Sequence, residues 1–140
     1  MSSAIEIIDL FAGPGGLGEG FAVAGRETAN PMTIRLSVEK DPYAIRTLRL
    51  RAFLRSFEGG FPSCYYDALN GARPLPHWNS LHPANWKHAL REAQQLELGS
   101  PGVFEQLSVE LDRAREERAG RTILIGGPPC QAYSLAGRSR

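Results

Sequence analysis

Two short segments of this 140-residue chain carry residue types that can do chemistry. In residues 123–131, an apolar run ends in Gly-Gly-Pro-Pro and is followed by Cys130 and Gln131. A thiolate is a strong nucleophile, and reactive groups collect where the strands of α/β sheets end. A Pro-Pro turn is an unusual setting for a structural cysteine, whereas Cys64 lies in a predicted strand and fits a core thiol. We therefore expect Cys130 to be a nucleophile.

The second segment, residues 8–18, is rich in glycine and contains Gly13, Gly15 and Gly18 in the spacing G-x-G-x-x-G. Glycine lets the backbone approach a ligand closely, and the helix that follows points its N–H groups at that ligand. Glu39 stands where such sites place an acid that accepts hydrogen bonds from ribose hydroxyls. The pattern predicts a cofactor site. Taken alone, it leaves open whether the cofactor is NAD or an adenosyl compound.

The composition limits the class of protein. A hydrophobic fraction of 42% indicates a soluble globular domain, and no apolar run is long enough to span a bilayer. With no signal segment at its start, the chain is expected in the cytoplasm. The formal net charge is only +1, whereas proteins that grip duplex DNA alone carry a strong basic excess. The three histidines lack zinc-ligand spacing, so no metal site is predicted.

Apolar patterns place both segments in an alternating chain. Strands are expected over residues 4–10, 33–38, 63–66 and 122–125, and helices over 17–24, 42–53, 84–98 and 100–120. Gly25 is expected to end the first helix and Asp41 to cap the second, whose arginines form a solvated face: Arg46, Arg49, Arg51 and Arg55. This order predicts an α/β fold with a doubly wound parallel sheet. Four strands with no closing helix indicate an incomplete sheet, in a fragment or in one of two chains.

Both segments resemble motifs of the DNA cytosine-carbon-5 methyltransferases. Residues 9–17, Asp-Leu-Phe-Ala-Gly-Pro-Gly-Gly-Leu, resemble the family's first motif, and residues 127–134, Gly-Pro-Pro-Cys-Gln-Ala-Tyr-Ser, its catalytic motif. The resemblance implies a Rossmann-like S-adenosylmethionine-dependent methyltransferase fold. Residues 1–140 would be the N-terminal part of its cofactor-binding and catalytic domain, with the target-recognition domain absent. The family's Glu-Asn-Val motif is also missing, so the isolated chain is expected to be inactive.

The resemblance implies roles for residues around the cofactor. The Phe11 ring would pack on adenine, Glu39 would hold the ribose, and Asp67, at the end of the predicted third strand, would contact the adenine amino group. The other residues assigned to the cofactor are Ala12, Gly13, Pro14, Gly16 and Pro129. Lys40 departs from the pattern, because relatives often place a bulky apolar side chain there.

The resemblance also implies a reaction. The Cys130 thiolate would add to carbon 6 of a cytosine flipped out of double-stranded DNA, and carbon 5 would then take the methyl group of S-adenosylmethionine. The loop expected to contact DNA contains Gln131, Ser134, Arg138 and Arg140. A bacterial restriction-modification setting follows from the family, and so does a location at the nucleoid.

Other readings remain open. An NAD-dependent oxidoreductase accounts for the glycine spacing but not for the turn that precedes Cys130. A non-catalytic subunit of a methyltransferase, or a tRNA cytosine methyltransferase, is also compatible with the sequence. Residues 83–120 match no motif and are expected to cover one face of the sheet.

Overall fold

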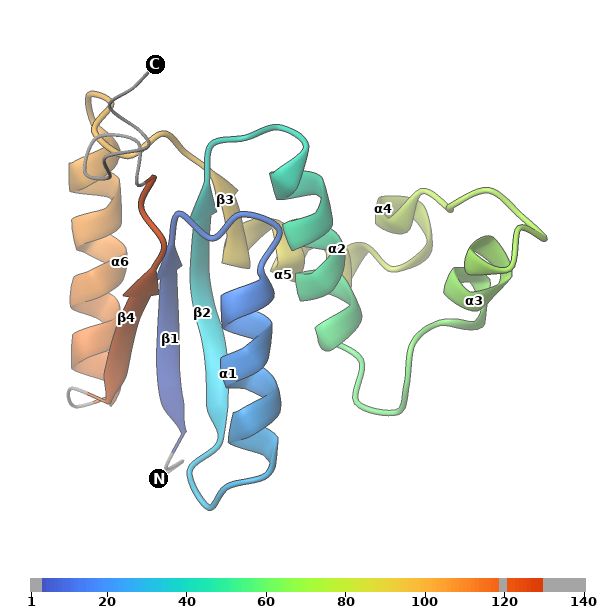
Figure 1. Cartoon of the computed structure of the whole chain (residues 1–140), viewed down its shortest axis with the longest axis horizontal. Coiled ribbons are helices and arrows are strands. Elements are labelled where there is room, and N and C mark those ends of the chain that lie inside the picture. Colours follow the sequence, from blue (N-terminus) through green and yellow to red (C-terminus); the bar gives the residue numbers. More distant parts are fainter. Residues whose placement is uncertain (1–3, 119–120, 130–140) are drawn as a thin grey trace.

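A computed structural model of the chain describes residues 4–118 and 121–129. Four strands form one parallel sheet, with helices packed on both of its faces (Figure 1). In sequence order the strands are β1 (Ile5–Leu10), β2 (Met32–Glu39), β3 (Ala93–Gln95) and β4 (Thr122–Gly126). Their order in the sheet is β3-β2-β1-β4. The expected α/β class and the four-stranded parallel sheet are therefore confirmed.

Six helices connect the strands, and none of those described is long and apolar enough to cross a membrane. They are α1 (Gly16–Arg26), α2 (Ala44–Arg55), α3 (Ser63–Leu69), α4 (Trp78–Leu81), α5 (Pro83–Glu92) and α6 (Val103–Arg118). The predicted positions of β1, β2, β4, α1, α2 and α6 agree with the structure to within a few residues.

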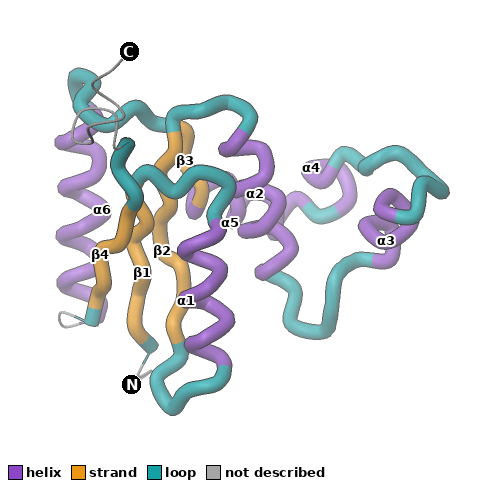
Figure 2. The backbone as a smooth tube through the Cα atoms, viewed as in Figure 1, coloured by secondary structure: helices purple, strands orange, loops and turns teal. Residues whose placement is uncertain are grey.

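The prediction of the third strand is wrong. Residues 63–66 form the start of α3, which lies out beyond α2 and away from the sheet (Figures 1 and 2). There Cys64 packs against an apolar cluster that contains Phe53 and Trp78. The third strand is instead Ala93–Gln95, inside a segment predicted to be helical. Pairing with the end of β2 overrides the helical pattern of these three residues.

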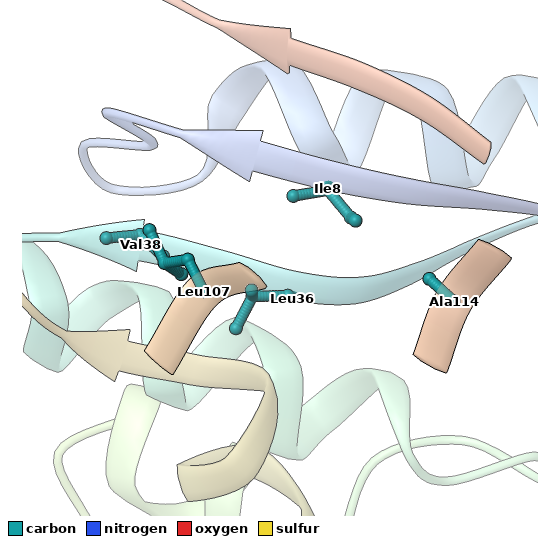
Figure 3. Close-up of a cluster of buried hydrophobic side chains, with 5 residues drawn as sticks. All are labelled: Ile8, Leu36, Val38, Leu107 and Ala114. Carbon is teal, nitrogen blue, oxygen red and sulfur yellow. The ribbon is translucent and has the colours of Figure 1, made fainter. Parts of the chain in front are cut away.

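The two faces of the sheet are covered by different helices. On one face, Ile8, Leu36 and Val38 of the strands pack against Leu107 and Ala114 of α6 (Figure 3). The expectation that residues 83–120 cover one face is thus met by α6. On the other face, α2 packs through Ile45 and Leu48 against Ala12 and Ala93.

The first helix continues through Gly25 to Arg26, so the prediction that Gly25 ends it is wrong. A Cβ atom on Gly25 would lie 2.3 Å from the backbone nitrogen of Met32, the first residue of β2. The glycine is therefore needed for the close approach of α1 to the sheet.

The prediction that the arginines of α2 form a solvated face is wrong for Arg55. Its side chain is only 14% exposed and forms ion pairs with Glu19 of α1 and Glu92 of α5. Burial raises the pKa of the Glu92 carboxyl group, and the charge of Arg55 opposes that rise. Arg55 thus links three helices through ion pairs, of which the partner on α5 is buried.

Candidate functional site

A cavity lies at the carboxyl end of the sheet, where parallel sheets commonly bind ligands. Figure 2 shows the loops after β1, β2 and β4 gathered at this end. The cavity has a volume of about 320 Å³, within the range of small-molecule sites. Its lining residues come from all four strand ends and are Phe11, Gly13, Val38, Glu39, Lys40, Leu96, Glu97, Leu98, Gly127 and Pro129. The structure therefore brings Phe11, Gly13, Glu39 and Pro129 together around one cavity.

The glycine loop is held in a constrained conformation. Phe11 has a φ of 57°, which is unusual for a bulky side chain, and its side chain is partly exposed in the cavity wall. Gly13 and Gly15 also have positive φ values, of 56° and 90°. The backbone nitrogen of Ala12 donates to the carbonyl of Val38 at 3.0 Å, which ties the loop to β2. Strain of this kind is often found at ligand sites.

Glu39 connects the end of β2 to the glycine loop. Its Oε2 accepts a hydrogen bond from the backbone N–H of Gly13 at 2.8 Å. Its Oε1 accepts from the N–H groups of Lys40 and Asp41 at 2.8 Å and 2.7 Å. These bonds fix the carboxylate at the cavity wall. Since a carboxylate oxygen can accept two hydrogen bonds, Oε2 keeps a lone pair for a ligand hydroxyl.

The correction of β3 also changes the acid at the third strand end. Asp67 lies in α3 and does not line the cavity. The acid that follows β3 is Glu97, which lines the cavity and accepts a hydrogen bond from Nζ of Lys40 at 3.3 Å. Sequence reasoning missed Glu97 because its segment was assigned to a helix. The alternation of apolar and polar residues from Gln95 to Leu98 was a signal for an extended segment.

Two leucine side chains line the cavity together with Lys40. Leu96 and Leu98 line the cavity on either side of Glu97 and supply apolar surface. The Lys40 ammonium group is drawn into an exposed ion pair with Glu97. This part of the cavity wall is therefore apolar despite the presence of Lys40.

Several predicted cofactor residues support the loop and do not line the cavity. Ala12 is buried against Ile45 and Leu48, Pro14 is exposed, and Gly16 begins α1. The regular part of α2 begins at Ala44, and Tyr43 directly before it makes no side-chain capping bond.

The Asp41 carboxylate caps the start of α2, as predicted. It accepts hydrogen bonds from the N–H groups of Tyr43 at 2.9 Å and Ala44 at 2.7 Å. Asp41 thus fixes the turn that leads from the cavity into α2.

The predicted nucleophile and DNA loop, Cys130, Gln131, Ser134, Arg138 and Arg140, lie outside the described residues. Their described neighbours, Gly127 and Pro129, line the cavity. Within residues 4–118 and 121–129, no group of three or more His, Cys, Asp or Glu side chains is arranged to hold a metal ion.

Two curated proteins are similar to this chain over 96% of its length. The type II methyltransferase M.Bpa9945I of Bacillus paralicheniformis is 29% identical, and the chain covers 32% of it. The putative type II methyltransferase M.OihORF3336P of Oceanobacillus iheyensis is 31% identical, and the chain covers 20% of it. The chain thus spans about a third or less of the length of these relatives.

No family model matches the chain, and no solved structure shows significant similarity to it. Over nearly its whole length, the chain is a distant homologue of type II methyltransferases.

Proposed function

We propose that this chain is the cofactor-binding part of a DNA methyltransferase that transfers a methyl group from S-adenosylmethionine to carbon 5 of cytosine. The observation that carries the proposal is the cavity at the sheet's carboxyl end. It joins Phe11 of the glycine segment and Glu39 at the end of β2 to Pro129, the residue before Cys130. A cofactor in this cavity would lie beside the segment that carries the nucleophile.

The lining residues fit the parts of S-adenosylmethionine. The adenine ring packs against Phe11 and the apolar walls formed by Leu96 and Leu98. Oε2 of Glu39, which already accepts from Gly13 N–H, accepts a second hydrogen bond from a ribose hydroxyl. Glu97, in place of Asp67, accepts a hydrogen bond from the adenine amino group.

Cys130 carries the chemistry in this proposal. Its thiolate adds to carbon 6 of a cytosine flipped out of the duplex, and the ring electrons move onto carbon 5. Carbon 5 then takes the methyl group that S-adenosylmethionine supplies. Loss of the carbon 5 proton and departure of the thiolate restore the ring and free the enzyme.

The DNA partner is also part of the proposal. Gln131, Ser134, Arg138 and Arg140 would contact the DNA near the flipped base. The net charge of the chain is near zero, and the relatives are at least three times as long. Most of the affinity for DNA would therefore come from the region of the relatives that this chain does not match.

A calorimetric titration of the chain with S-adenosylmethionine, with NAD as the control ligand, tests the cofactor site. Saturable binding of S-adenosylmethionine alone supports the proposal. Binding of NAD, or of neither ligand, contradicts it.

The nucleophile is tested by joining the chain to the remaining region of a relative and measuring methyl transfer to DNA. Cys130→Ser should abolish transfer, and Cys64→Ser, the matched control, should retain it. Equal activity of the two variants would remove Cys130 from the mechanism.

A further inference from the structure

Asp9, near the end of β1, is a buried carboxylate that the cavity does not use. Its residue is 1% exposed and does not line the cavity. Among the described residues, neither Oδ1 nor Oδ2 has a hydrogen-bond partner. Burial raises the pKa of this carboxyl group, because a charge without full solvation costs free energy. Folded proteins rarely keep such a group without a use for it.

The carboxylate faces the start of α1. Ile8 points toward α6, so Asp9, the next residue along the strand, points to the opposite face. There a Cβ atom on Gly18 would lie 3.1 Å from Asp9 Oδ2, which shows how closely the helix and the carboxylate approach.

The donors at the start of α1 explain what the carboxylate does there. The N–H groups in the first turn of a helix have no partner within the helix. In α1 the i→i−4 hydrogen bonds begin at Glu19, whose N–H donates to the carbonyl of Gly15. The N–H of Gly18 lowers the pKa of Asp9, against the larger effect of burial, although it stands outside hydrogen-bond geometry. The negative charge is therefore placed to attract the free donors of the first turn.

The same helix start continues from the glycine loop. Gly15 N donates to Ala12 O at 3.0 Å, and Gly13 N donates to Glu39. Glu39 thus holds the loop from the end of β2, at the cavity. We propose that Asp9 is a positioning residue for the other end of the glycine loop, where α1 begins. It fixes the first turn of α1 in the arrangement that binds the cofactor. The cofactor part of this inference rests on the proposed function.

Asp9→Asn separates positioning from a merely structural role, because the two predict opposite changes in melting temperature. A merely structural role predicts a lower melting temperature. The amide removes the buried charge, so the melting temperature should stay the same or rise. It also presents a weaker acceptor to the first turn, so amide hydrogen exchange over residues 13–18 should become at least tenfold faster. The affinity for S-adenosylmethionine should fall at least tenfold.

Ser37→Ala is the matched control. Ser37 pairs with Asp9 in the sheet, is equally buried, and its Oγ has no hydrogen-bond partner among the described residues. Its removal should leave hydrogen exchange over residues 13–18 unchanged.

Three results would overturn the inference: loss of folding or a lower melting temperature in Asp9→Asn, unchanged exchange in that variant, or equal acceleration in Ser37→Ala. If the unsubstituted chain does not bind S-adenosylmethionine, the proposed function fails, while hydrogen exchange and melting temperature still decide the role of Asp9.

Discussion

Replacing Gly126 by alanine tests how tightly the end of β4 is held against β1. Gly126 pairs with Leu10, and a Cβ atom on it would lie 2.3 Å from the Leu10 carbonyl oxygen. Real Cβ contacts essentially never fall below 3.0 Å, so the two strands must move apart by about 1 Å at this point. Overpacking of this kind costs about 1–3 kcal/mol, and the lower entropy of the unfolded alanine chain offsets roughly 0.5 kcal/mol of it. We therefore expect Gly126→Ala to lower the free energy of unfolding by about 0.5–2.5 kcal/mol.

Urea unfolding of Gly126→Ala and Gly127→Ala measures the effect. A Cβ atom on Gly127 would meet no heavy atom within 4 Å, so that variant should stay within about 0.5 kcal/mol of the unsubstituted chain. In the enzyme completed with a relative's remaining region, Gly126→Ala should also slow methyl transfer on the order of 100-fold, because a 1 Å misplacement near the reacting groups has that effect. Equal stability of the two variants would refute the close approach of β4 to β1.

Three further predictions concern the helices and the cavity. Gly25→Ala should destabilise the chain by about 1–3 kcal/mol, whereas Gly20→Ala, in open space on the same helix, should stabilise it by about 0.5–1 kcal/mol; thermal denaturation giving both the same sign would contradict this. Arg55→Met leaves Glu92 without its countercharge and should cost about 3 kcal/mol at pH 7. Arg55 lowers the pKa of Glu92, so its removal raises this pKa further above the unfolded value, and acidification stabilises the variant more than the unsubstituted chain. The loss should therefore shrink as the pH is lowered from 7 to 5, and a loss in urea unfolding that grows instead would count against the buried charge. Glu39→Gln places an NH₂ group against backbone N–H donors and should weaken S-adenosylmethionine binding at least tenfold in calorimetry, and an unchanged affinity would exclude this carboxylate from the site.

Much of the fold could be predicted from local pattern. β1 is rich in isoleucine and buried along most of its length, as a central parallel strand is, and in β2 apolar residues alternate with polar ones. The glycines between the two strands mark a tight turn. Phe11 and Glu39 could be placed for the same reason, since Phe11 directly follows β1 and Glu39 is the last residue of β2. Pairing of the two strands then brings these residues to one cavity.

Features fixed by distant contacts could not be predicted. β3 has only three residues, Ala-Gln-Gln, and only pairing with β2 makes it a strand. Because the third strand was predicted at residues 63–66, the acid at its end was assigned to Asp67. The acid that follows the actual β3 is Glu97. In the same way, the composition of α2 cannot reveal that Arg55 has carboxylate partners on α1 and α5.

The central place of β1 has a consequence for the order of folding. Its neighbour β2 follows it closely in sequence, whereas its other neighbour, β4, is separated from it by most of the described chain. Closing so long a loop carries a large entropy cost, so the β1–β4 contacts are expected to form late. During synthesis, the glycine loop and Glu39 emerge first, and the wall supplied by Gly127 and Pro129 comes last. We therefore expect the cavity to be among the last parts of the molecule to assemble, and a ligand bound in it to slow the unfolding of the whole sheet.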